Sequence, residues 1–250
     1  MYATGTLGNP PPLEENRWAV VIGIADYSGT RSDLHYTDDD AIEMLQALTD
    51  VYGYHRENIL LLISDYHINN ATRQDIISAI GWLKNNVDSG DEAVFFYSGH
   101  GTYGIAMDGD NERIDEGIVP YECTKSSVIW DGELKQLFED IRTTRVIFIF
   151  DSCYAGGMTD LASDGRVIAM ATSETRVGYE SSALKNSVFI YYLIDQGVLS
   201  GKADTLDHDG DGILGEPNDV TIEEAFTYAK NKSGRQSPTI SDSFQNDCLL

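Results

Sequence analysis

The chain has 250 residues and a formal net charge of −24, and 42% of its residues are hydrophobic. This apolar fraction excludes a chain that is disordered throughout, and the length fits one large domain or two small ones. The acidity excludes a general nucleic-acid binder, which needs a basic face, and no apolar run approaches the roughly 20 residues of a membrane-spanning helix. The acidic surface favours cationic partners, such as Ca²⁺ or Lys/Arg-rich substrates, or a salt-rich setting, unless it serves solubility alone.

Short apolar runs alternate with amphipathic stretches along most of the chain. Residues 1–16 are rich in Gly, Pro and Glu and are expected to form a flexible lead-in to one domain at 17–250. Strands are expected at 18–25, 58–63, 93–97, 145–150 and 167–171, and helices at 37–50, after Thr72, and at 130–140, 187–196 and 222–230. This order predicts an α/β fold with a mostly parallel central sheet, helices on both faces, and functional groups beyond the carboxyl ends of the strands.

Two glycine-containing motifs follow two of the expected strands directly. His100 lies in the Ser-Gly-His-Gly sequence after the third strand, and Cys153 lies in the Asp-Ser-Cys sequence after the fourth. An imidazole beside a thiol makes a nucleophile, because the imidazole takes the thiol proton. The backbone N–H groups of Gly101 and Cys153 are expected to stabilise the oxyanion of an acyl-transfer reaction.

These motifs resemble those of caspase-like cysteine peptidases, in particular the metacaspases and the prokaryotic caspase homologues. His100 precedes Cys153 by about 50 residues, as in caspases. Segments 17–27, 36–44 and 114–121 are also similar to segments of that family. The resemblance implies a caspase–haemoglobinase-like α/β sandwich and an endopeptidase that uses His100 and Cys153 as a dyad.

The resemblance also implies an acidic pocket for the residue before the scissile bond. Metacaspases place Arg or Lys there, and the matching positions in this chain are Asp40, Ser98 and Asp151. A carboxylate pairs with a guanidinium or ammonium group through charge-assisted hydrogen bonds. Asp38 and Asp39 are the alternatives to Asp40 if the alignment shifts.

An Asp-rich loop at 207–224 indicates a calcium site. Asp207, Asp209 and Asp211 occupy positions 1, 3 and 5 of an EF-hand-type loop, followed by a glycine at position 6. Position 12 is an Asn, so Glu224 is expected to complete the coordination, with Glu216 as the alternative. Ca²⁺ is therefore the expected cofactor, and no organic cofactor is indicated.

A second acidic stretch is implicated only by the family resemblance. Metacaspases bind calcium through a loop and an Asp shortly after the nucleophile, although the loop of this chain is shorter. The corresponding acidic and amide residues are Asp108, Asp110, Asn111, Glu112, Asp115, Glu116 and Asp160.

Three functions remain open at this point. The first is a calcium-stabilised or calcium-activated cysteine endopeptidase, expected to be monomeric, that cleaves protein or peptide substrates after Arg or Lys. The second has the same fold but cleaves after Asp or Asn, and the third is a non-catalytic calcium-dependent binding module. Dependence on millimolar calcium favours an extracellular or cell-envelope location over a cytoplasmic one.

Overall fold

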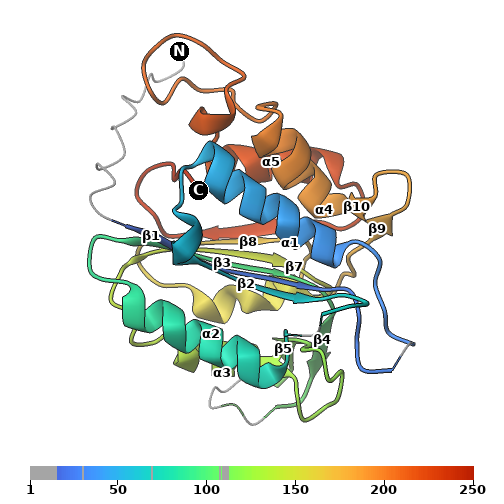
Figure 1. The fold of residues 1–250 in the computed structure, drawn as a ribbon. Coiled ribbons are helices and arrows are strands. Elements are labelled where there is room, and N and C mark those ends of the chain that lie inside the picture. Colours follow the sequence, from blue (N-terminus) through green and yellow to red (C-terminus); the bar gives the residue numbers. More distant parts are fainter. Residues whose placement is uncertain (1–15, 30, 69, 107, 109–112) are drawn as a thin grey trace.

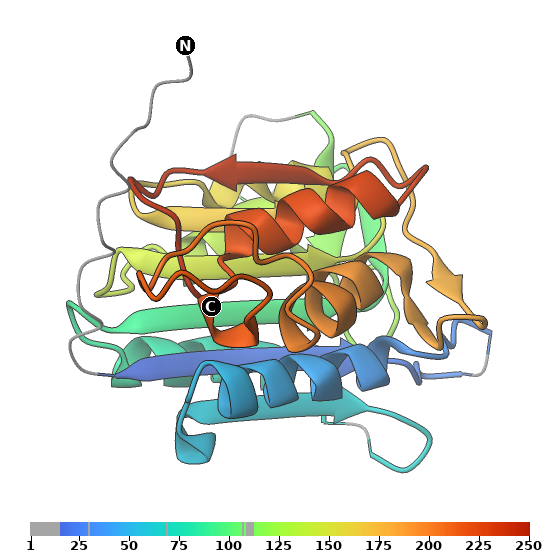
Figure 2. The same cartoon turned by 90° about the horizontal axis from the view of Figure 1, so that it is seen from above.

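A parallel sheet forms the centre of the computed structural model, which describes residues 16–250 except 30, 69, 107 and 109–112. Within these residues the main sheet has the strand order β11-β8-β7-β3-β1-β2, in which only β11 is antiparallel to its neighbour (Figures 1 and 2). Its strands are β1 (Arg17–Ile24), β2 (Ile59–Ser64), β3 (Glu92–Ser98), β7 (Arg145–Asp151), β8 (Arg166–Met170) and β11 (Thr239–Asp242). The predicted α/β class and the five predicted strands are confirmed, whereas β11 was not predicted.

Helices cover both faces of this sheet, as predicted (Figure 1). One face carries α1 (Thr37–Gln46), α4 (Val188–Ile190) and α5 (Ile222–Lys232), and the other carries α2 (Arg73–Asn86) and α3 (Asp131–Leu137). π-Helical turns extend α1 through η1 (Ala47–Val51) and α4 through η4 (Tyr191–Leu199). Short 3₁₀ helices in the described residues are η2 (Arg56–Asn58), η3 (Ala155–Leu161) and η5 (Pro217–Asp219).

Two small sheets lie beyond the carboxyl ends of the main strands. The first has the order β4-β5-β6, and the second pairs β9 with β10. Their strands are β4 (Gly101–Gly104), β5 (Asp115–Ile118), β6 (Ile129–Trp130), β9 (Glu180–Ser181) and β10 (Asn186–Ser187). The sequence pattern did not predict these strands, because they are short and lack an extended apolar run.

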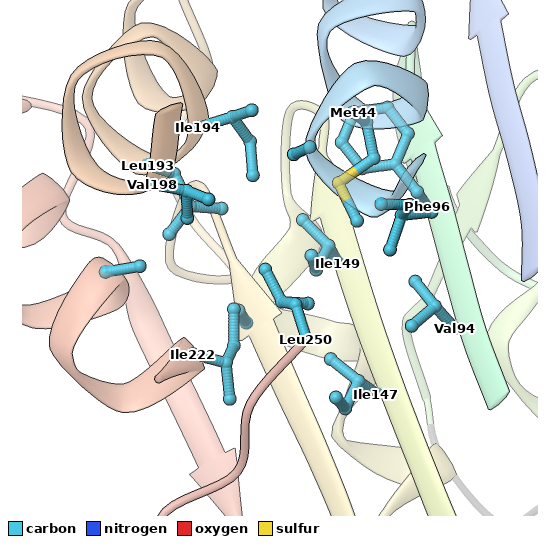
Figure 3. Close-up of a cluster of buried hydrophobic side chains, with 14 of the residues drawn as sticks. Met44, Val94, Phe96, Ile147, Ile149, Leu193, Ile194, Val198, Ile222 and Leu250 are labelled. Carbon is cyan, nitrogen blue, oxygen red and sulfur yellow. The ribbon is translucent and has the colours of Figure 1, made fainter. Parts of the chain in front are cut away.

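Alternate residues of each central strand enter separate hydrophobic layers. On β1, Ala19 and Val21 pack with α1, η4 and α5, whereas Val20 and Ile22 pack with α2 and α3. Figure 3 shows the first layer, where side chains of β3 and β7 meet those of α1 and η4. Because both faces are buried, the strands read as continuous apolar runs, which made them recognisable in the sequence.

The start of α1 lies close against the end of β1. A methyl group on Gly23 would collide with the carbonyl oxygen of Thr37 and would lie 2.6 Å from the Cβ atom of Ala41. The Thr37 hydroxyl also donates a 2.6 Å hydrogen bond to the carbonyl of Ile24. This contact fixes the first turn of α1 against the carboxyl end of β1. The three consecutive aspartates of α1 lie in this turn.

No helix among the described residues combines the length and the apolar character needed to cross a membrane.

We predict opposite effects of alanine at two glycines. Gly23→Ala should lower the free energy of unfolding by about 1–3 kcal/mol, because α1 must shift away from β1. Gly81→Ala, in the middle of α2 with no atom within 4 Å of the added methyl group apart from the chain neighbours and the nearby backbone of α2 itself, should raise it by about 0.5–1 kcal/mol. Urea unfolding measures both values, and equal stabilities of Gly23→Ala and wild type would contradict the close contact.

Candidate active site

The register of β3 and β7 brings both sequence motifs to one place. Ser98 and Asp151 are the last residues of these neighbouring parallel strands and are paired in register. His100 and Cys153 each lie two residues further along. The pairing therefore aligns two short segments, each with a polar residue followed by a catalytic candidate.

Asp40, Ser98 and Asp151 come together as a buried polar group. The Ser98 hydroxyl lies 2.7 Å from Oδ2 of Asp40, to which it donates, and 3.4 Å from Oδ2 of Asp151. The backbone N–H of Ser187 donates to Oδ1 of Asp40 at 3.2 Å. Asp40 is fully buried and Asp39 is exposed, so the structure places the third aspartate of α1 in the cluster.

Beside this cluster lies a cavity of about 310 Å³ that reaches the thiol. Its lining includes His100, Asp151, Cys153, Gly178 and Glu180. Glu180 was missed in the sequence, where it stands in a polar segment without a motif. Its Oε1 atom accepts the backbone N–H groups of His35 and Tyr36, both at 2.8 Å, which holds the carboxylate at the cavity wall.

Burial raises the pKa of both buried aspartates. For Asp40 burial is the largest cause, followed by the charge of Asp151. Burial raises the pKa of Asp151 from 3.8 to about 7. A positively charged side chain in the cavity would favour the ionised carboxylates, because it replaces water as the compensating charge. In the empty cavity, both carboxyls therefore hold a proton more readily than exposed aspartates do.

Backbone groups and aromatic side chains orient His100. The Nε2 atom of its ring lies 2.7 Å from the carbonyl oxygen of Ser32, and its backbone N–H donates to the Tyr27 hydroxyl at 2.7 Å. The Tyr97 hydroxyl donates to the His100 carbonyl, and the Tyr27 ring lies 4.7 Å from the imidazole. A carbonyl only accepts, so in a neutral His100 the proton is on Nε2 and Nδ1 is the nitrogen that can accept another. Ser32 and Tyr27 were not identified from the sequence.

The Cys153 thiol is only partly accessible. Its Sγ atom accepts the Gly178 N–H at 3.4 Å. Burial is the main cause of a raised pKa, and the Asp151 charge also raises it, whereas the Gly178 N–H lowers it. The resting sulfur is therefore a thiol, and its activation requires a base such as His100. In the described hydrogen-bond network the sulfur is bonded to Gly178 rather than to His100; such contacts often tighten only with substrate.

Gly101 contacts the nucleophile segment through its backbone. A methyl group there would collide with the Cys153 carbonyl and lie 2.9 Å from the Ser152 hydroxyl. The Val119 N–H donates to the His100 carbonyl, and pairs alternate along an antiparallel ladder. The Gly101 N–H therefore points away from β5 and is not used in the β4–β5 ladder.

One group of converging carboxylates lies beyond β5. Ligand atoms of Asp108, Asp115 and Asp131 lie within 4.8 Å of one another. Asp131 was not considered in the sequence; burial is the main reason why its pKa rises to about 8. Asp160 forms an ion pair with Lys135 at 3.3 Å and is outside this group. Asp110, Asn111 and Glu112 lie outside the described residues.

Acidic side chains of the Asp-rich loop converge in two groups. Asp207 and Asp209 converge with Asp219, and Asp209 and Asp211 converge with Glu216, the expected alternative to Glu224. The role of Glu224 as closing ligand stays a prediction, and its carboxylate is outside both groups. The reason is local: its carboxylate accepts the Thr205 and Leu206 N–H groups at 2.8 and 2.9 Å and forms a capping box with Thr221 at the start of α5.

Comparisons with known proteins agree with this geometry. The family model of the metacaspase, peptidase C14 domain matches residues 17–162. The chain belongs to the metacaspase family. Similar proteins include metacaspase-4 of Arabidopsis thaliana, 37% identical over 58% of this chain and 35% of the relative, and metacaspase-1 of Schizosaccharomyces pombe, 33% identical over the same shares. The chain thus matches about a third of the length of these curated relatives.

A solved structure supports the fold over nearly the whole chain. Protein GSU0716 from Geobacter sulfurreducens superposes with a TM-score of 0.66 and covers 93% of this chain and 95% of its own, at 15% identity. This similarity bears on the fold alone. Together with the family match it confirms the caspase-like α/β architecture.

We predict that neutralising Asp151 stabilises the protein in a pH-dependent way. The pKa of Asp151 is higher in the folded than in the unfolded chain, so the wild-type free energy of unfolding falls as the pH rises through the interval between the two values. Asp151→Asn should be more stable than wild type by roughly 2–4 kcal/mol at pH 8, and this difference should disappear near pH 4.

Urea unfolding across this pH range measures the effect. Asp140→Asn, at an exposed position, is the control and should follow the wild-type curve. A constant difference between Asp151→Asn and wild type at all pH values would contradict a buried carboxylate with a raised pKa.

Proposed function

We propose that this metacaspase-family chain is a cysteine endopeptidase that cleaves after Arg or Lys. The observation that best supports the proposal is the single cavity that joins the thiol and the imidazole to a set of buried or anchored carboxylates. A basic side chain of suitable length would enter this cavity and meet Asp151 and Glu180 while its carbonyl carbon lies beside Cys153. Cleavage after Asp or Asn would place an acidic or uncharged side chain against these carboxylates, so it is disfavoured.

The proposed reaction is an acyl transfer in two stages. Nδ1 of His100 takes the thiol proton as the sulfur attacks the carbonyl carbon, and the N–H groups of Gly101 and Cys153 stabilise the resulting oxyanion. His100 then gives its proton to the leaving amine, and the C–N bond breaks to leave a thioester. A water molecule, deprotonated by His100, attacks the thioester and releases the acid and the thiol.

Peptide amides that end in Arg, Lys, Asp or Asn test this proposal. Wild-type protein should release the fluorophore from the Arg and Lys amides, and Cys153→Ala should reduce kcat/KM by about 10³-fold or more. Cys123→Ala removes a different free cysteine and should retain activity. Glu180→Gln should reduce the preference for Arg over Asn. Cleavage that persists in Cys153→Ala, or that favours Asp, would overturn the proposal.

We further propose that Ca²⁺ binds the loop 207–219 and stabilises it. Hard carboxylate oxygens from neighbouring turns suit this ion. Three of them come from Asp207, Asp209 and Asp219, the last of which ends η5. The inner group of Asp108, Asp115 and Asp131 has the same ligand chemistry and is the alternative position. The bound ion would supply positive charge that holds the acidic loop together.

Removal of calcium should therefore lower the melting temperature. Calcium at 100 times its Kd should stabilise the protein by about 2.7 kcal/mol. Asp209→Asn, at the residue shared by both loop groups, should remove most of this calcium-dependent shift. Thermal unfolding with calcium or with chelator measures it. A shift that survives in Asp209→Asn but is lost in Asp131→Asn would assign the ion to the inner group instead.

A further inference from the structure

A second cavity of about 550 Å³ borders the residue that follows the nucleophile. Its described lining consists of Tyr103, Ile114, Glu116, Tyr154, Glu174 and Thr175. None of these residues lines the first cavity, in which Cys153 and His100 take part. The two cavities therefore border adjacent residues of the chain, Cys153 in the first and Tyr154 in the second.

The arrangement of the chain assigns the second cavity to the leaving group. If the side chain before the scissile bond occupies the first cavity, the reacting carbonyl lies at Cys153, between the two cavities. Tyr103 follows Gly101 by two residues on β4, so both face the same side of that strand, and Gly101 lies against the Cys153 carbonyl. Substrate residues after the scissile bond thus continue past Gly101 toward Tyr103 and Tyr154.

The lining of the second cavity is aromatic and acidic. The Tyr103 and Tyr154 rings meet edge to face at a centroid distance of 4.7 Å, and 56% of Tyr103 is exposed. Glu174 is exposed at the rim. Glu116 is largely buried and packs against Gly157, which holds its carboxylate group at the wall. Aromatic faces and carboxylates together favour a cationic side chain.

We propose that this cavity binds the first two residues after the scissile bond and selects Lys or Arg there. The inference rests on the proposed peptidase function and adds a second, separate site of basic-residue recognition. Acidic residues at these substrate positions would meet Glu174 and are rejected. Substrates would therefore be segments with basic residues on both sides of the cleaved bond.

Two internally quenched peptides test the proposal. Both have Arg before the scissile bond; one has two Lys residues after it and the other has two Glu residues. We expect wild type to cleave the Lys peptide with a kcat/KM at least about fivefold higher, and Glu174→Gln to reduce this ratio by about threefold, as suits an exposed charge pair. Tyr103→Ala should reduce the ratio as well.

The matched control is Glu57→Gln, which removes an equally exposed carboxylate before β2, at the opposite end of the sheet. It should leave the Lys/Glu ratio unchanged, because Glu57 lies far from the second cavity. If the net negative charge alone set the ratio, Glu57→Gln and Glu174→Gln would change it equally. A wild-type ratio near one, or equal ratios in Glu174→Gln and Glu57→Gln, would overturn the proposal.

An Arg coumarin amide separates this inference from the proposed function, because it has no residues after the scissile bond. Cleavage of the amide without a Lys/Glu preference in the peptides would refute the second site and leave the peptidase intact. If the protein cleaves none of the peptides, their binding to Cys153→Ala, measured by fluorescence anisotropy, still tests the second cavity. Tighter binding of the Lys peptide that weakens in the Cys153→Ala/Glu174→Gln double variant would support the site, and equal binding of both peptides would refute it.

Discussion

The in-register pairing of β3 with β7 determines the rest of the site. It sets Ser98 opposite Asp151, and because side chains alternate along a strand, a slip of one residue in β3 would turn Ser98 away from Asp40, and one in β7 would turn Asp151 away from the cavity. The same slip would displace His100 and Cys153, which follow by two positions. The proposed recognition and the proposed chemistry therefore depend on one set of backbone hydrogen bonds between β3 and β7.

This arrangement buries Asp40 completely and Asp151 almost completely. Asp40 is fully buried, and its partners are the Ser98 hydroxyl and the Ser187 N–H rather than a cation. Burying such groups costs stability, and two apolar layers, one on each face of the sheet, offset that cost. The first turn of α1 also offsets part of this cost, because the positive end of the helix dipole favours acidic residues there.

The sequence predicted those parts whose signal is local. The central strands are continuous apolar runs, and the dyad residues directly follow two of them, so strand order was enough to bring them together. Glu180 and Asp131 reach their positions through contacts with distant segments, which no spacing in the chain encodes. Glu224 shows a competing local signal: the pattern Thr-x-x-Glu at 221–224 is that of a capping box, and it explains the residue better than a metal ligand does.

The raised pKa of Asp151 would link the proposed binding of a basic side chain to the release of a proton. With the pKa of Asp151 near 7, part of the free protein holds a proton on this buried carboxyl in neutral solution. A guanidinium bound there as proposed would favour the ionised form and release that proton into the buffer. The heat of binding would then vary with the ionisation enthalpy of the buffer, so calorimetry in two buffers would count the protons that leave the pocket.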